Sequence, residues 1–268
     1  MKILAVGDPH GEINKIKNIS LREIDLVLIT GDIGKADFAR KRFFEDIKRQ
    51  KEGLPKLELT KTDVKRIYSE IYDSTMGILK YISKTVPTYS ILGNVGADMI
   101  KGSEVKKDET KFKVKLPYLR EGVSNLNNFY LVKNAVRNIS GLRIGFLEYF
   151  IDTSWVKEFK PSDYNKKLKK AKKETVKAKR ILNNFKSLDI LVCHQPPYGY
   201  LDKVSPKYNP PKDWIGKHAG SKVILDYIKK YQPKYVFCGH IHEGEGKAKI
   251  GKTEVYNLGV AGHKIINL

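Results

Sequence analysis

The segment Tyr235-Val236-Phe237-Cys238-Gly239-His240-Ile241-His242 joins an apolar run to a pair of histidines. The run from Tyr235 to Cys238 is typical of a strand buried in a sheet. His240 and His242 are two positions apart on the turn that leaves this strand, so their side chains point to opposite sides. Each histidine can therefore serve a different metal ion, and the segment predicts a two-metal centre whose remaining ligands come from elsewhere in the chain.

The first two strands predicted near the N-terminus also end in polar side chains. The apolar run Lys2–Val6 leads into Asp8 and His10, and the run Asp25–Ile29 leads into Asp32. With a short amphipathic segment between them, the two runs are typical of a parallel βαβ unit, in which ligands bind at the carboxyl ends of the strands. Carboxylate and imidazole ligands at these ends favour Zn, Mn, Fe or Ni.

Two later strands repeat this arrangement. Asn94 follows the run Thr88–Leu92, and His194 follows the run Asp189–Cys193. Asn94 by itself is typical of a turn, and it becomes a candidate ligand only through its neighbours. The candidate metal ligands are Asp8, His10, Asp32, Asn94, His194, His240 and His242. Because the set holds oxygen and imidazole ligands without a thiolate, it favours a catalytic pair of hard or borderline ions over a structural zinc.

The rest of the chain predicts helices and further strands. Helical spacing of apolar residues predicts helices over 38–51, 62–84 and 157–186 and, with Ser221 as its N-cap, over 222–231. Short alternating runs between residues 111 and 149, among them 129–132 and 142–147, predict strands of a second sheet. The runs 247–250, 253–257 and 264–267 predict closing antiparallel strands.

Residues 157–186 form a strongly basic segment, with 12 Lys and Arg against three acids. Apolar residues recur in a narrow stripe at helical spacing, which predicts a long helix with lysines on its other sides. Two interpretations stay open: a solvated helix face packed on the domain, or a platform for nucleic acid or another polyanion. Interleaved aromatic residues that would support base stacking are not part of this pattern.

The whole chain carries a formal net charge of +21, from 51 Lys and Arg against 30 Asp and Glu. The electrostatic field of this charge favours anionic partners, and both phosphate esters and nucleic acid are anionic. Apolar runs fall well short of the roughly 20 residues that a membrane helix needs, and the apolar start is too short for a signal peptide, so we expect a cytoplasmic protein without membrane contact. Cys193 and Cys238 are expected to be buried and not to form a disulfide. The oligomeric state is left open.

The candidate ligands also form an ordered set of motifs: Asp8-x-His10, Gly31-Asp32, Gly93-Asn94, the lone His194 and Gly239-His240-x-His242. This set resembles the calcineurin-like metallophosphoesterases and covers nearly the whole chain. The resemblance implies an α/β fold, namely a four-layer α-β-β-α sandwich of two mixed sheets flanked by helices, with a dinuclear metal site at the carboxyl ends of the strands. It further implies a single domain over residues 1–268, in which 157–186 is a basic helical insertion.

The resemblance also implies how the ligands divide between two divalent metal ions. Asp8, His10 and His242 would hold the first ion, Asn94, His194 and His240 the second, and Asp32 would bridge them. Manganese is the first expectation for both ions, with nickel, iron, zinc and magnesium as alternatives. The segment from His194 to Gly246 looks most like a small cytosolic phosphodiesterase branch of the family.

Val95 departs from the family pattern, which has a histidine after the motif asparagine. A positioned general acid contributes about 10² to 10⁴ in rate, and valine cannot supply one. His218 is our leading substitute, as the catalytic acid or a phosphate ligand, and Gly220 and Ser221 are predicted to bind substrate beside it at the N-terminus of the 222–231 helix. The weaker candidates for the acid role are Asp98, Tyr198 and Asp202.

These features predict hydrolysis of a phosphodiester by a hydroxide held between two metal ions. Esters with acidic leaving groups should react best, because they need little protonation. Two alternatives stay open: a nuclease acting on DNA or RNA, favoured by the net charge, and a non-catalytic metal-binding scaffold for a protein partner, motivated by Val95. The intact set of seven ligands argues against the scaffold, because a scaffold has no chemical need for them.

Overall fold

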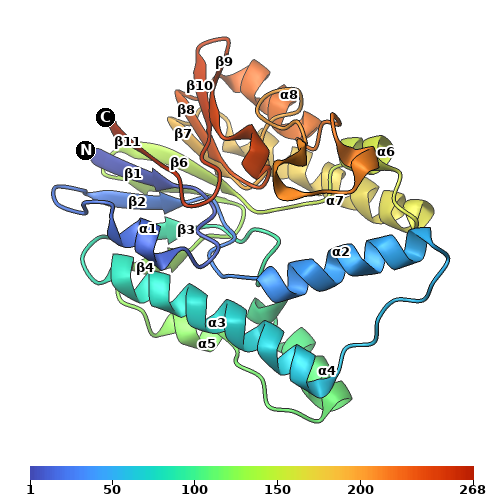
Figure 1. Cartoon of the computed structure of the whole chain (residues 1–268). Helices are drawn as coiled ribbons and strands as arrows, with labels where there is room; N and C mark the ends of the chain where they lie inside the picture. Colours follow the sequence, from blue (N-terminus) through green and yellow to red (C-terminus); the bar gives the residue numbers. More distant parts are fainter.

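Two β-sheets lie face to face between two layers of helices in the computed structural model, which describes residues 1–268 (Figure 1). The strands are β1 Lys2–Val6, β2 Leu26–Ile29, β3 Thr88–Ser90, β4 Phe129–Leu131, β5 Ala135–Ile139, β6 Leu142–Leu147, β7 Ile190–Cys193, β8 Tyr235–Cys238, β9 Gly246–Ile250, β10 Thr253–Asn257 and β11 His263–Asn267. The α-helices are α1 Ile13–Lys17, α2 Asp37–Lys51, α3 Lys61–Ser83, α4 Gly102–Phe112, α5 Leu119–Ser124, α6 Thr153–Phe159, α7 Tyr164–Phe185 and α8 Lys222–Tyr231. The predicted α/β sandwich of four layers is therefore confirmed.

Both sheets are mixed: the first has one antiparallel edge strand and the second has two. The first has the strand order β11-β1-β2-β3-β4, in which β1 to β4 run parallel and β11 runs antiparallel to β1. The second has the order β5-β6-β7-β8-β10-β9, in which β6, β7, β8 and β10 run parallel between antiparallel β5 and β9. Parallel strands place their carboxyl ends along one edge, where α/β proteins bind their ligands.

Alternation of side chains along the strands produces the layers. In β1, Ile3 and Ala5 pack between the two sheets, whereas Leu4 and Val6 pack with α1 and α3. In β7, residues 190 and 192 face the first sheet, whereas residues 191 and 193 face α7 and α8. Strands covered on both faces need apolar residues at every position, which is why the sequence shows them as continuous apolar runs.

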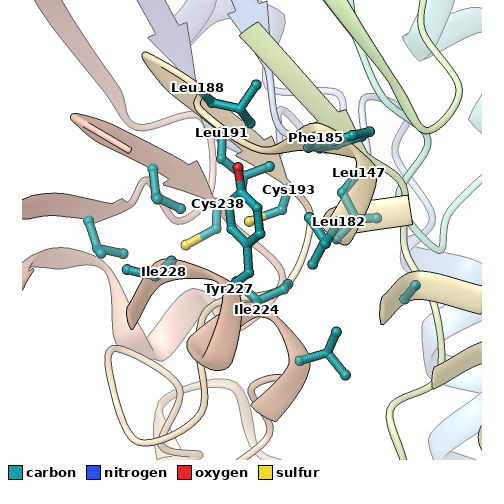
Figure 2. Close-up of a cluster of buried hydrophobic side chains, with 14 of the residues drawn as sticks. Leu147, Leu182, Phe185, Leu188, Leu191, Cys193, Ile224, Tyr227, Ile228 and Cys238 are labelled. Atoms are coloured by element: carbon teal, nitrogen blue, oxygen red, sulfur yellow. The ribbon is translucent and has the colours of Figure 1, made fainter. Parts of the chain in front are cut away.

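The core between the second sheet and its helices is shown in Figure 2. Leu182 of α7 and Ile224 of α8 pack there against Leu191 and the two cysteines. Cys193 and Cys238 are fully buried, as predicted, and both are free thiols. Burial raises the pKa of each thiol, so neither is a reactive thiolate at neutral pH.

The segment between β3 and β5 differs from the prediction. Helices α4 and α5 lie between residues 102 and 124, where the sequence patterns predicted no helix, and β4 joins the first sheet by pairing in parallel with β3. The prediction that residues 129–132 belong to the second sheet was therefore wrong. An apolar run shows that a strand is buried but not which sheet it joins, and here the crossover through α4 and α5 returns the chain to the first sheet.

The basic segment forms two helices rather than one. Helix α6 ends at Phe159, Lys160 has a φ of 43°, and α7 begins at Tyr164 after Pro161. Proline disfavours helical geometry at the residue before it and lacks the N–H that a helix uses, so the helix breaks here. The apolar stripe of α7 packs on the second sheet, and lysines such as Lys172 and Lys179 face solvent.

The three closing strands also differ in part from the prediction. β10 is antiparallel to β9 as expected, but it runs parallel to β8. β11 pairs antiparallel with β1 and completes the first sheet, so the two chain ends lie beside each other (Figure 1). Among the helices, none is both long and apolar enough to cross a bilayer.

Candidate metal centre

The seven predicted ligands lie at the carboxyl ends of five strands that meet at one edge of the sandwich. Asp8 and His10 follow β1, Asp32 follows β2, Asn94 follows β3, His194 follows β7, and His240 and His242 follow β8. Both sheets contribute, so the cluster forms where their edges face each other. Residues more than 200 positions apart in sequence, such as His10 and His242, come into direct contact.

Asp8, His10 and His242 form a first group of converging ligand atoms. His10 Nε2 lies 3.1 Å from His242 Nε2, which lies 3.6 Å from Asp8 Oδ2. Ligands at about 2.1 Å from a tetrahedral ion are roughly 3.4 Å apart, close to these separations. Two imidazole nitrogens and one carboxylate oxygen arranged in this way can hold a divalent ion.

Asp8, Asp32 and His194 form a second group. His194 Nε2 lies 3.5 Å from Asp32 Oδ2 and 2.9 Å from Asn94 Oδ1. The same Asp32 Oδ2 lies 3.9 Å from His10 Nε2 of the first group. One carboxylate oxygen is therefore close to a histidine of each group, which is the position that a bridging ligand needs.

His240 contacts the second group through its ring. Its ring centroid lies 4.8 Å from that of His194, and its main-chain N–H donates to Asp8 Oδ2 at 2.6 Å. Burial, followed by the charge of His194, lowers the pKa of His240 to about 3. A neutral imidazole keeps the nitrogen lone pair that metal binding requires.

Two buried carboxylates determine the electrostatics of the cluster. Asp8 is fully buried and Asp32 is 4% exposed. Burial alone would raise the pKa of each, but His194 leads the groups that outweigh burial and lower both pKa values. Ionised carboxylates removed from water need a cationic partner. The charge and the donor atoms of the cluster therefore fit a pair of divalent metal ions.

Thr30 orients two of the ligands. His194 Nδ1–H donates to the Thr30 carbonyl oxygen at 3.0 Å, which leaves Nε2 facing Asp32 and Asn94. Metal-binding histidines use such a bond to fix the ring and its tautomer. Burial alone would lower the pKa of His194, but Asp32 and Asp8 outweigh it and raise the pKa to about 9, so an incoming ion must displace a proton. Thr30 Oγ1 also donates to Asp8 Oδ1 at 2.8 Å.

The backbone is strained at three of these ligands. His10, Asp32 and His240 have φ values of 43°, 36° and 66°, and left-handed geometry in a residue other than glycine costs of order 1 to 3 kcal/mol. Strain of this kind persists where the surroundings fix it, often at functional sites. Gly93 shows how tightly the ligands pack, because a Cβ there would overlap Asp32 and His194.

Val95 supports the cluster through its main chain. Its N–H donates to Asp32 Oδ1 at 2.7 Å. Its side chain packs against the apolar cluster that includes Ile71 of α3 and Leu119 of α5. This position therefore holds Asp32 in place and offers no proton to a substrate.

Two tyrosines at the cluster were not predicted from the sequence. The Tyr149 ring centroid lies 5.7 Å from that of His194 and 5.2 Å from that of His240, and Tyr208 lies edge-on to His242 at 5.7 Å. Tyr149 follows the predicted strand 142–147, so the rule that polar residues follow strand ends could have found it. Tyr208 lies in the long loop after β7, which no periodic pattern positions.

His218 is held by a buried carboxylate outside the hydrogen-bond network of the cluster. Its Nδ1–H donates to Asp202 Oδ1 at 2.7 Å, and its ring contacts Tyr198 at 5.3 Å. Asp202 and Tyr198, the two weaker candidates for the acid role in this loop, thus both contact His218 directly. The third, Asp98, pairs with Lys101 at 3.3 Å on the surface. The acid or phosphate-binding role of His218 stays a prediction.

Gly220 and Ser221 use their polar groups inside the protein. Ser221 caps α8 as predicted, with Oγ accepting the Ile224 N–H at 3.2 Å, and donates to buried Asp152 Oδ2 at 2.6 Å. The Gly220 N–H donates to Asp202 Oδ2 at 3.0 Å. Their predicted part in substrate binding stays a prediction.

The variant Ser221→Ala distinguishes a structural role of Ser221 from a role in substrate binding. Loss of the cap and of a partner for a buried carboxylate is expected to lower the free energy of unfolding by about 1 to 2 kcal/mol, with KM unchanged, if the residue is structural. Urea unfolding and steady-state kinetics measure both quantities, with the exposed Ser20→Ala as the matched control. A raised KM at unchanged stability would instead assign Ser221 to the substrate.

Carboxylates and imidazoles gathered at the carboxyl edge of two facing mixed sheets define the class of metal-dependent hydrolases. The family model described as calcineurin-like phosphoesterase matches residues 1–244 of the 268. The chain belongs to this family, and the resemblance seen in its motifs is confirmed. Proteins of the family use divalent metal ions and act on phosphate esters.

Curated relatives share only a segment with this chain. Metallophosphoesterase domain-containing protein 1 of Homo sapiens is 35% identical over 74 residues, which cover 27% of this chain and 20% of that protein. The UPF0046 protein K07C11.7 of Caenorhabditis elegans is 30% identical over 69 residues, covering 26% and 20%. The matched segment thus spans about a fifth of the length of each relative.

Solved structures resemble the chain over nearly all of its length. One crystal structure has a TM-score of 0.56 at 18% identity and covers 97% of this chain and 90% of its own. A dimetal phosphatase from Danio rerio has a TM-score of 0.48 at 10% identity, covering 98% and 88%. At these identities the first likeness supports the fold alone.

Proposed function

We propose that this chain is a phosphodiesterase that uses two divalent metal ions, with manganese as the first expectation. Asp8, His10 and His242 would hold one ion, Asn94, His194 and His240 the other, and Asp32 would bridge them. The observation that carries this proposal is the position of Asp32 Oδ2, close to both His10 and His194. When bound, two such ions lower the pKa of a shared water and neutralise phosphoryl oxygens.

The residues of the chain have distinct tasks in this proposal. Thr30 and the His240 N–H fix the carboxylate of Asp8, and the Val95 N–H fixes that of Asp32. Ligands held in this way need little rearrangement during the reaction, which is the basis of electrostatic catalysis. A diester rather than a monoester is favoured because the cluster adjoins, at Tyr208, a cleft that could receive a second ester substituent.

A substrate panel tests the proposal. Hydrolysis of bis(4-nitrophenyl) phosphate and 4-nitrophenyl phosphate is measured with Mn, Ni, Mg and EDTA, and we expect metal-dependent turnover with the higher kcat/KM for the diester. Turnover that survives removal of metal would overturn the two-metal assignment. Bound metal without turnover of any ester would favour the scaffold instead.

His218→Ala tests the substitute acid. If His218 protonates the leaving oxygen, the variant should lose about 10² in kcat on a diester with an alkyl leaving group and far less on an aryl one. His263→Ala, an exposed histidine on β11, is the matched control. An unchanged rate on the alkyl ester would remove His218 from the acid role.

A further inference from the structure

A cleft opens beside the metal-ligand cluster, between α2 and the loop segment 208–213. Its volume is about 900 Å³, near the upper end of the roughly 300 to 1,000 Å³ typical of ligand pockets. Its floor and walls come from one face of α2 and from Tyr208 and the residues after it. Residues of the basic helix α7 do not line it.

The cleft has an excess of unpaired positive charge. Five of its lining side chains are Lys or Arg and three are acids. Two of the acids are already paired, Asp213 with Lys51 and Asp37 with Lys35. The four remaining cations form no ion pair: Arg40, Lys41, Lys48 and Lys212. A row of cations without partners favours an extended anion over a single small one.

Two aromatic side chains of the cleft lie close to one of its unpaired cations, Arg40. Arg40 Cζ lies 5.5 Å from the Phe44 ring centroid and 5.7 Å from that of Tyr208. Tyr208 in turn contacts the metal-ligand candidate His242 edge-on. The series His242, Tyr208, Arg40 and Phe44 thus leads from the cluster along the cleft. Positive charge interleaved with aromatic rings is the pattern that binds single-stranded nucleic acid, through phosphates and stacked bases.

Helix α2 contributes little to the hydrophobic core. None of its 15 residues is buried, and Figure 1 shows it lying away from both sheets. Its ends are held by polar contacts, including the ion pair of Lys51 with Asp213 across the cleft. At 1.5 Å per residue α2 is about 22 Å long, enough for several extended nucleotides.

We propose that the cleft between α2 and residues 208–213 binds single-stranded nucleic acid whose phosphodiester lies at the Asp/His cluster. The proposal rests on the proposed phosphodiesterase function and gives it a substrate class. Nucleotides on one side of the scissile bond occupy the cleft, with phosphates beside the four unpaired cations Arg40, Lys41, Lys48 and Lys212 and a base beside Phe44.

Binding is measured by fluorescence anisotropy with a labelled phosphorothioate oligothymidylate of ten nucleotides, which resists hydrolysis. Four phosphate contacts predict a slope of log K against log salt of about −2.8, or roughly 50-fold weaker binding at 200 mM than at 50 mM KCl. The double variant Arg40→Glu/Lys48→Glu should bind at least about tenfold more weakly and halve this slope. The matched reversal Lys172→Glu/Lys179→Glu on α7 should bind within about twofold of the unchanged chain.

Phe44→Leu distinguishes nucleic acid from an acidic protein. Loss of one stacking ring should weaken oligothymidylate binding about tenfold and leave competition by polyglutamate unchanged. Equal losses in the α2 and α7 reversals, or an unchanged affinity in the α2 reversal, would overturn the proposal. So would a Phe44→Leu variant that binds oligothymidylate normally, which would favour an acidic protein partner.

Different measurements would contradict the proposed phosphodiesterase activity and the proposed binding of nucleic acid in the cleft. If the unchanged chain hydrolyses bis(4-nitrophenyl) phosphate but its oligonucleotide binding does not depend on Arg40 and Lys48, the cleft assignment is wrong and the phosphodiesterase stands. If binding follows the cleft variants but no diester is hydrolysed, the cleft stands and the proposed activity fails. Circular dichroism checks that each variant is folded.

Discussion

Asp32→Asn is expected to lower kcat/KM for bis(4-nitrophenyl) phosphate by at least about a thousandfold, or about 4 kcal/mol of transition-state stabilisation. The substitution keeps the shape of the side chain but replaces a carboxylate oxygen with an amide group and removes its charge. Asp32 Oδ2 lies 3.9 Å from His10 Nε2 and 3.5 Å from His194 Nε2. Removing a carboxylate that lies near both histidines should therefore weaken both metal sites together.

Metal content provides a second readout for this variant. Saturating manganese should raise the Tm of the unchanged chain, since a ligand at 100 times its Kd stabilises the folded state by about 2.7 kcal/mol. We expect Asp32→Asn to lose most of this rise and to retain less metal in elemental analysis. Asp73→Asn on the exposed side of α3 is the matched control. Full activity in Asp32→Asn would refute the bridging assignment.

The central strands and the residues that follow them could be predicted because burial leaves a direct trace in sequence. A strand covered on both faces must be apolar at every position. This holds for both Leu26–Ile29 and Ile190–Cys193. Polar residues such as Asp32 and His194 then stand out within three residues of the strand ends. These residues could then be expected to meet in space, because parallel strands bring their carboxyl ends to one edge of the sheet.

The association of β4 with the first sheet could not be predicted in the same way. Its burial pattern is only partial, and strand pairing over the crossover of α4 and α5 depends on tertiary packing that no local pattern records. The break at Pro161, by contrast, was visible in the sequence. The lysine pattern continues across it, although proline is a strong local signal for a helix end.

The surroundings of the site were less predictable than its ligands. Tyr208 reaches His242 from a loop, and Arg40 reaches Tyr208 from a helix without a buried face. Neither contact has a periodic signature, because each depends on how a loop and a helix fold back on the edge of the sheets. The sequence concentrates lysines on α7, whereas the cleft with interleaved aromatic rings lies along α2.

Val95 predicts a steep dependence of rate on the leaving group. Esters with nitrophenyl leaving groups should exceed alkyl esters of the same series by about 10² to 10⁴ beyond what a protonating enzyme would show. The reason is that position 95 holds a valine whose side chain packs on the apolar cluster of α3 and α5. A series of aryl and alkyl thymidine phosphodiesters measures the slope of log kcat against the pKa of the leaving alcohol.

Val95→His should flatten that slope. Its main chain lies beside the proposed bridging carboxylate, because the N–H of residue 95 donates to Asp32 Oδ1, and an imidazole there must turn from the apolar packing of Val95 toward the cluster. We expect about a hundredfold gain on alkyl esters and less than about threefold change on nitrophenyl esters, for which proton donation matters little. Val95→Ala removes the same packing without adding an acid and should give no gain on either class. Equal slopes in Val95→His and the unchanged chain would show that another group already supplies the proton, and the alkyl-ester rates of His218→Ala then decide whether it is His218.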